Sequence, residues 1–192
     1  MKKITFILAL IMFVGVLMTS CGGEYTRGTI TETGYYSEWL GLEFVPTQNM
    51  IMASAAEVEE MMGLTQEEKQ DIQWSKVIEA YEMMATDAMG LDSVVVMTEG
   101  LTKENNTVNK FIDKLKSEFS YISEVEITYA ETCEEVIAGE KYTRFEYEIS
   151  LMNQTYKQIM FLRKIGERMA VITITASNEG VEEMFLSCFK AK

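Results

Sequence analysis

The chain has 192 residues and is strongly acidic, with 17 Lys and Arg against 30 Asp and Glu and a formal net charge of −13. This charge repels phosphate backbones, so we expect no nucleic-acid partner. The sequence contains no histidine, which removes the commonest general base and metal ligand. A Ser-His-Asp triad, a Cys-His dyad and a His-based zinc site are therefore excluded within this chain.

The first 20 residues have the pattern of an export signal. Lys2 and Lys3 give a basic start, an apolar run follows over residues 4–18, and two small residues precede Cys21. The cysteine at the cut resembles the lipobox of bacterial lipoproteins. This resemblance implies that Cys21 receives a thioether-linked diacylglyceryl group and becomes the mature N-terminus. An uncleaved transmembrane helix is the alternative, but the apolar run is shorter than the ~20 residues that span a bilayer.

The lipid anchor determines where we expect the protein to work. Two acyl chains, such as palmitate, hold a protein stably at a membrane, so we expect it on the extracytoplasmic face of the cell membrane. Residues 1–20 are the expected signal peptide, 21–27 the lipidated N-terminus and tether, and 28–192 a single domain. Because Lys2 and Lys3 are the only charged residues of the signal, cleavage leaves a net charge of −15.

Two cysteines remain after lipidation, Cys133 and Cys188. A disulfide between them is permitted outside the cell. Cys188, however, shares an apolar helical stripe with Val181 and Phe185, where a buried thiol packs well. The sequence leaves both alternatives open.

The first half of the chain predicts short strands and short helices. β-type runs occupy 29–32 and 35–37 around Gly34, and a third run at 42–45 ends before Pro46, the only proline. Two capping-box patterns follow: Ser54 with Glu57 begins a helix that ends at Gly63, and Thr65 with Glu68 begins a second helical stretch.

Residues 77–86 fit either a helical stripe or one face of a strand, on which Tyr81, Met83 and Ala85 would lie together. The turn at Gly90 and the valine-rich run at 93–98 favour a hairpin, and hence a strand.

The second half has the clearest periodicity. A helix is predicted over 107–119, and a closing helix over 179–189. Between them we predict four strands, at 125–129, 142–151, 155–163 and 168–176. In the second of these strands, Phe145, Tyr147 and Ile149 share one face. Strands in runs with helices between and after them indicate an α+β fold built on an antiparallel sheet.

The stretch SEWLGLEFVP resembles a motif of the PsbP-like families, in which serine, glycine, phenylalanine and proline stand at the positions of Ser37, Gly41, Phe44 and Pro46. Leu40 and Leu42 occupy its apolar positions, and the hairpin and helix at the C-terminus match the ending of these families. The group includes a photosystem subunit, a nuclear-import regulator and DcrB-like envelope lipoproteins. The resemblance implies an antiparallel sheet flanked by helices on both sides, and accessory binding without a common catalytic site. Where the families have Gly-Trp after the proline, this chain has Thr47 and Gln48.

Three kinds of residue cluster could have a chemical role. Tyr35, Tyr36 and Trp39 could form a peptide or sugar platform, although core packing explains them as well. The glutamates at 57–60 and 131–135 fit a solvated surface better than a Ca²⁺ site, since no D-x-D-x-D-G loop occurs. Methionines such as Met83 and Met89 suit either an adaptable surface or the core.

No nucleophile, P-loop or dinucleotide-binding motif occurs, and we expect no cofactor and no metal. We therefore expect a non-enzymatic accessory or scaffold module for an envelope complex. A small-ligand or peptide carrier is the alternative, and a hydrolase that works without histidine is a third hypothesis.

Overall fold

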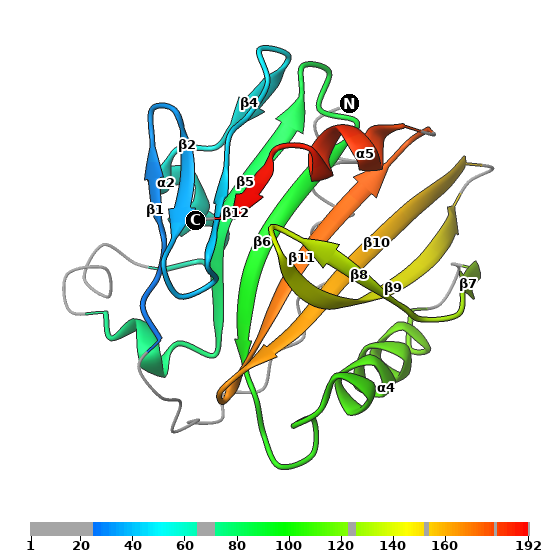
Figure 1. Ribbon diagram of the computed structural model, residues 1–192. Coiled ribbons are helices and arrows are strands. Elements are labelled where there is room, and N and C mark those ends of the chain that lie inside the picture. Colours follow the sequence, from blue (N-terminus) through cyan, green and yellow to red (C-terminus); the bar gives the residue numbers. More distant parts are fainter. Residues whose placement is uncertain (1–24, 65–71, 123–125, 152–153, 179, 192) are drawn as a thin grey trace.

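The computed structural model describes residues 25–64, 72–122, 126–151, 154–178 and 180–191. They form two antiparallel sheets (Figure 1). Sheet A has the order β1 (Thr29–Thr31), β2 (Gly34–Ser37), β3 (Leu42–Phe44) and β12 (Phe189–Ala191). Sheet B has the order β4 (Met50–Met52), β5 (Glu79–Asp87), β6 (Ser93–Gly100), β11 (Arg168–Ala176), β10 (Gln154–Ile165), β9 (Glu140–Leu151) and β7 (Glu126–Tyr129), and β8 (Cys133–Ile137) also pairs with β9.

The described helices are short apart from one. They are α2 (Ala55–Met61), the 3-10 turn η1 (Trp74–Lys76), α4 (Val108–Phe119) and α5 (Val181–Leu186). The capping box at Ser54 is confirmed: its hydroxyl accepts from the Glu57 amide, and the Glu57 carboxylate accepts from the Ser54 amide. The second predicted capping box, at Thr65, lies outside the described residues. No described helix has the length and apolar character to cross a membrane.

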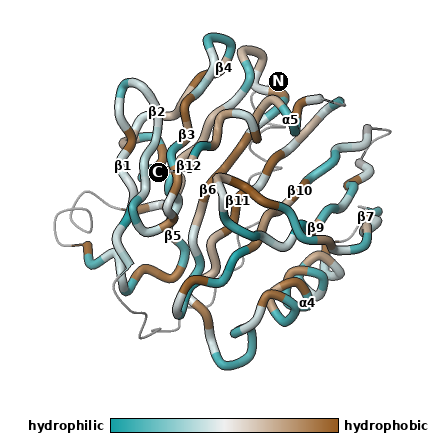
Figure 2. The backbone as a smooth tube through the Cα atoms, viewed as in Figure 1, coloured by the Kyte–Doolittle hydropathy of each residue, from teal (hydrophilic) through white to brown (hydrophobic). Residues whose placement is uncertain are grey.

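The two faces of sheet B are covered differently. On one face, the apolar stripe of α4 packs in one core with Phe145, Tyr147 and Ile149 of β9, and Val58 of α2 joins this core from its place against β5. On the other face, sheet A and α5 form a second core with the apolar side chains of β6, β10 and β11. Figure 2 shows the hydrophobic colour concentrated along these central strands, with hydrophilic turns at their ends. The expected antiparallel sheet is confirmed, but a second small sheet shares one side with the helix α5.

A β-bulge in β5 explains why residues 77–86 resisted assignment from sequence. They do form a strand, as the hairpin signal favoured, but the pairing with β6 shifts between Tyr81 and Met83. The extra residue, Glu82, reverses the alternation. Met83 and Ala85 therefore lie in the core under sheet A, whereas Tyr81 lies in the core under α4. Our prediction that all three share one face is wrong.

The closing helix is shorter than predicted. Only Val181–Leu186 is helical, and Phe189 belongs to β12, which pairs with β3. The short strands β4, β8 and β12 had no periodic signal of their own. Cys188 is buried and Cys133 is exposed, and both are free thiols.

Candidate functional site

Tyr25, which we expected to belong to the tether, is buried in the structure. Its hydroxyl donates a hydrogen bond to Glu82 in the β5 bulge. Glu82 also accepts from the Gly28 amide at 2.7 Å and from the Tyr35 hydroxyl at 2.8 Å. Residues 25–27, which we assigned to the tether, therefore pack against the fold.

Glu82 is fully buried, and three donors compensate for the loss of its hydration. Burial raises the pKa of this carboxyl, while the hydrogen bonds from Tyr25, Gly28 and Tyr35 act in the opposite direction. Gly28 is required for this approach, since a Cβ there would lie 2.5 Å from the Tyr35 ring. The network therefore fixes the N-terminal segment to strand β5, next to the edge strand β4 of sheet B.

Arg168 is a buried cation that contacts this network through Tyr25. Its guanidinium lies 4.2 Å from the centre of the Tyr25 ring. It donates to the carbonyls of Val77 and Ile78 at 2.8 and 3.0 Å, and to the Thr98 hydroxyl. Burial lowers the pKa of Arg168. Tyr25 is thus held by two contacts: its hydroxyl donates to Glu82, and its ring face packs against the Arg168 guanidinium.

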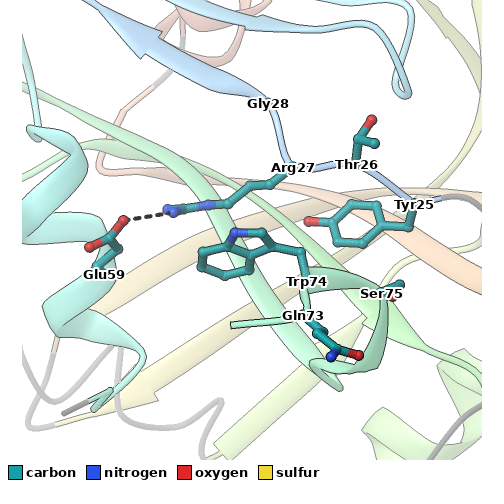
Figure 3. Close-up of a pocket in the computed structure, with 8 residues that line it drawn as sticks. All are labelled: Tyr25, Thr26, Arg27, Gly28, Glu59, Gln73, Trp74 and Ser75. Carbon is teal, nitrogen blue, oxygen red and sulfur yellow. Dashed lines mark hydrogen bonds and ion pairs between the residues drawn. The ribbon is translucent and has the colours of Figure 1, made fainter. Parts of the chain in front are cut away.

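An open pocket of about 540 Å³ lies beside this N-terminal segment (Figure 3). Arg27 is its central side chain. Its Nε donates to the Tyr81 carbonyl at 3.1 Å, and its Nη1 lies 3.2 Å from the Glu59 carboxylate. The guanidinium also lies 4.4 Å from the centre of the Trp74 ring. The remaining lining residues are Tyr25, Thr26, Gly28, Gln73 and Ser75.

A second polar cluster lies where α4 meets sheet B. Lys114 of α4 lies 2.7 Å from Glu99 and 3.7 Å from Glu118. Burial and the negative charge of Glu99 raise the pKa of Glu79 to about 7. Burial also raises the pKa of Glu99. A small cavity beneath these groups has an apolar floor, and no described cluster of residues is suited to hold a metal ion.

The predicted aromatic platform is divided by the structure. Tyr35 is buried and belongs to the Glu82 network, whereas the half-buried Trp39 packs edge-on against Tyr25. Tyr36 is the half-buried neighbour of Tyr35 on β2, where successive side chains point to opposite faces. The three side chains thus do not form one flat surface.

The other sequence candidates are also dispersed. Met83 is in the core, while Met89 is exposed on the β5–β6 turn. Within the described residues, Glu57 serves its helix cap and Glu134 pairs with Lys141 on the surface.

Sequence reasoning did not single out Arg27 or Trp74, and it assigned Glu59 to a solvated surface. They come from three separate segments, and none belongs to a spaced motif. Trp74 is one of only two tryptophans in the chain, which was the single available signal.

The fold is of the α+β class and is similar to that of a PsbP protein. The solution structure of cyanobacterial PsbP (CyanoP) from Synechocystis sp. PCC 6803 matches with a TM-score of 0.51 at 10% sequence identity. The match covers 90% of this chain and 98% of that chain. A crystal structure from Bacteroides thetaiotaomicron VPI-5482 matches with a TM-score of 0.43 at 8% identity, over 86% of this chain and 48% of that chain. No family model and no curated protein matches this sequence.

Proposed function

We propose that this protein is a lipoprotein, anchored through Cys21 on the extracytoplasmic face of a membrane, that serves as a non-enzymatic accessory or scaffold module of an envelope complex. The PsbP-like fold is compatible with an accessory role. The observation that carries the proposal is the burial of Tyr25 only four residues after Cys21.

The short connection keeps the domain close to its anchor. Four residues of extended chain reach about 14 Å. Since Tyr25 is fixed to Glu82 and packed under Arg168, the domain cannot move away by unwinding its first residues without breaking a buried network. A protein held in this way meets partners in or beside the membrane rather than distant ones.

The carboxylates in and beside the Arg27 pocket support a non-enzymatic role for this pocket. Glu82 is enclosed and has no contact with solvent. Among the residues that line the pocket, Glu59 is the one carboxylate, whereas glycoside hydrolysis uses two carboxyl groups across a cleft. The described pocket thus lacks the pair of acid and base that a histidine-free hydrolase needs.

The pocket favours a second candidate function, the binding of a small ligand. It has an arginine, a glutamate and a tryptophan in one wall and opens to solvent. Binding sites of this size commonly carry a few polar groups that orient the ligand. A ligand-binding role is compatible with an accessory role in the same protein.

The experiment compares wild-type protein with Cys21→Ala in the native host. We expect the intact mass of the mature wild-type chain to include a diacylglyceryl group, and we expect Cys21→Ala to leave the membrane fraction or stay unprocessed. Cross-linking in intact membranes should join the wild-type domain to a defined membrane partner. An unmodified Cys21, or hydrolysis of a substrate that is lost in Glu59→Gln, would contradict the proposal.

A further inference from the structure

Arg27 is largely but not fully buried, and it keeps unused hydrogen-bonding capacity. Its side chain is only 10% exposed. A guanidinium has five N–H donors, and the hydrogen bonds of Arg27 to described residues use Nε and Nη1. Among the described residues, none accepts a hydrogen bond from Nη2. Donors with little solvent exposure are normally hydrogen-bonded. Nη2 can therefore donate to an anionic group that enters the pocket.

Glu59 limits what such a ligand can be. Its carboxylate lies 3.2 Å from Arg27 Nη1, so any anion that reaches Nη2 also approaches a negative charge. A ligand with only a positive charge that approaches Glu59 would be repelled by the neighbouring Arg27 guanidinium. The wall of the pocket presents one positive and one negative charge side by side, and a ligand that carries both charges satisfies it best.

Trp74 argues against a neutral sugar in the same place. Sugars and flat ligands stack on an aromatic face, but one face of this indole is covered by the Arg27 guanidinium at 4.4 Å. This contact also fixes the guanidinium, together with the bond from Nε to the Tyr81 carbonyl. The charged pair is thus preorganised, which reduces the entropic cost of binding.

We propose that this pocket binds a small zwitterion, with its anionic group on Arg27 Nη2 and its ammonium group beside Glu59. A phospholipid headgroup of the phosphoethanolamine type has this chemistry, and so does a free amino-phosphate or amino acid. The inference deepens the ligand-binding side of the proposed function. The headgroup source also rests on the anchor, which would place residues 25–28 near the bilayer surface.

Trp74 supplies a direct readout of binding. The chain has two tryptophans, so Trp39→Phe leaves Trp74 as the only indole. The full-length protein, purified in a nonionic detergent, is titrated with four probes while Trp74 fluorescence is followed. The probes are glycerophosphoethanolamine, glycerol 3-phosphate, ethanolamine and glucose. We expect saturation by glycerophosphoethanolamine with a dissociation constant below about 1 mM, at least tenfold tighter than for the other three probes.

Charge variants test the two ends of the ligand separately. Arg27→Gln and Glu59→Gln should each weaken glycerophosphoethanolamine binding at least tenfold. Glu59→Gln should in addition strengthen binding of glycerol 3-phosphate, because it removes the negative charge beside Arg27. The matched control is Glu60→Gln, the same change one residue further along α2 on an exposed side chain that does not line the pocket. Its affinities should equal those of the Trp39→Phe parent.

A second arm distinguishes the two sources of the ligand. The full-length protein is placed in nanodiscs of phosphatidylethanolamine and phosphatidylglycerol, or of phosphatidylglycerol alone. A difference in Trp74 fluorescence between the two discs, abolished by Glu59→Gln, identifies a lipid headgroup. Binding of the soluble probe without that difference identifies a free zwitterion, and either result supports the inference.

Absence of saturation by glycerophosphoethanolamine would overturn the inference, as would equal affinity for a singly charged probe or for glucose. These failures leave the proposed function intact, because lipidation of Cys21 and membrane cross-linking are measured independently of the pocket.

Discussion

Strand β5 carries two partly or fully buried carboxylates three residues apart, and they are stabilised in opposite ways. Glu82 is fully buried and accepts hydrogen bonds from two tyrosine hydroxyls and one backbone amide. Glu79 is half-buried and faces Glu99 and Glu118, with Lys114 as the compensating charge. Hydrogen bonds from fixed neutral donors stabilise a buried carboxylate, as at Glu82. Neighbouring carboxylates instead raise the pKa of a carboxyl group toward neutral pH, as at Glu79.

The two carboxylates therefore have different roles in the fold. The Glu82 network fastens the N-terminal segment and supports the Arg27 pocket, so its role is to hold a geometry. The Glu79 cluster lies under α4, and its net charge depends on pH. Substitutions in the two clusters should therefore change the free energy of unfolding in different and predictable ways.

The largest effect is expected for Glu82→Ala. Removing the carboxylate leaves the hydroxyls of Tyr25 and Tyr35 and the Gly28 amide without their acceptor in a buried site, which should destabilise the fold by ~3–5 kcal/mol. Chemical denaturation measures this loss. Glu82→Gln keeps one acceptor oxygen and should lose less. A loss below ~1 kcal/mol for Glu82→Ala would show that the network is not structural.

Tyr35→Phe should have the next largest effect. It removes one donor to Glu82 and leaves the ring in place, so we expect a loss of ~1.5–3 kcal/mol, the range for hydrogen bonds to charged groups. Tyr121→Phe is the control, because Tyr121 is 82% exposed. Equal unfolding free energies for the two variants would contradict the role assigned to Tyr35.

Lys114→Met should weaken the other side of the sheet by ~1–2 kcal/mol, between the values for exposed and buried ion pairs. The loss should be larger at pH 8 than at pH 5, because fewer of the carboxylates around Lys114 are protonated at the higher pH. Lys110→Met, an exposed lysine on the same helix, serves as the control. Denaturation curves at the two pH values give both quantities.

Glu79→Gln should differ from the other variants in sign, because it should raise the stability of the fold. The pKa of Glu79 is about 7 in the fold against an ordinary 4.5. Between these values the unfolded chain ionises while the folded one keeps its proton, so wild-type stability falls as pH rises from 4.5 to 7. The variant lacks this fall. Its advantage should be absent near pH 4 and greatest above pH 7, and the same difference at every pH would contradict the assignment.

Periodicity predicted the elements whose burial follows a regular face. The α4 stripe with Phe111 and Phe119, and the alternation of Phe145 and Tyr147 in β9, are both confirmed. Three-residue strands such as β4 and β12 are too short to show a period, and their partners lie far along the chain. The bulge at Glu82 interrupts the alternation of side chains between the two faces of β5, so a prediction based on strict alternation fails there.

The candidate site was less accessible from sequence than the fold. The sequence assigns Arg27 to the tether, because nothing in it indicates that the nearby Tyr25 is buried. Glu59 belongs to a run of helix glutamates that sequence patterns assign to solvent. Only the three-dimensional approach of α2, η1 and the N-terminal segment brings Arg27, Glu59 and Trp74 together.

The last strand of the chain has a consequence for the order of folding. β12 pairs with β3 through Phe189 and Phe44, which are 145 residues apart. Closing a loop of that length is slow and follows local pairing. Sheet A therefore cannot be completed until β12 has been synthesised, and until then β3 has an unpaired edge. Strand β12 closes sheet A, so a nascent domain that lacks β12 would present an edge open to other chains.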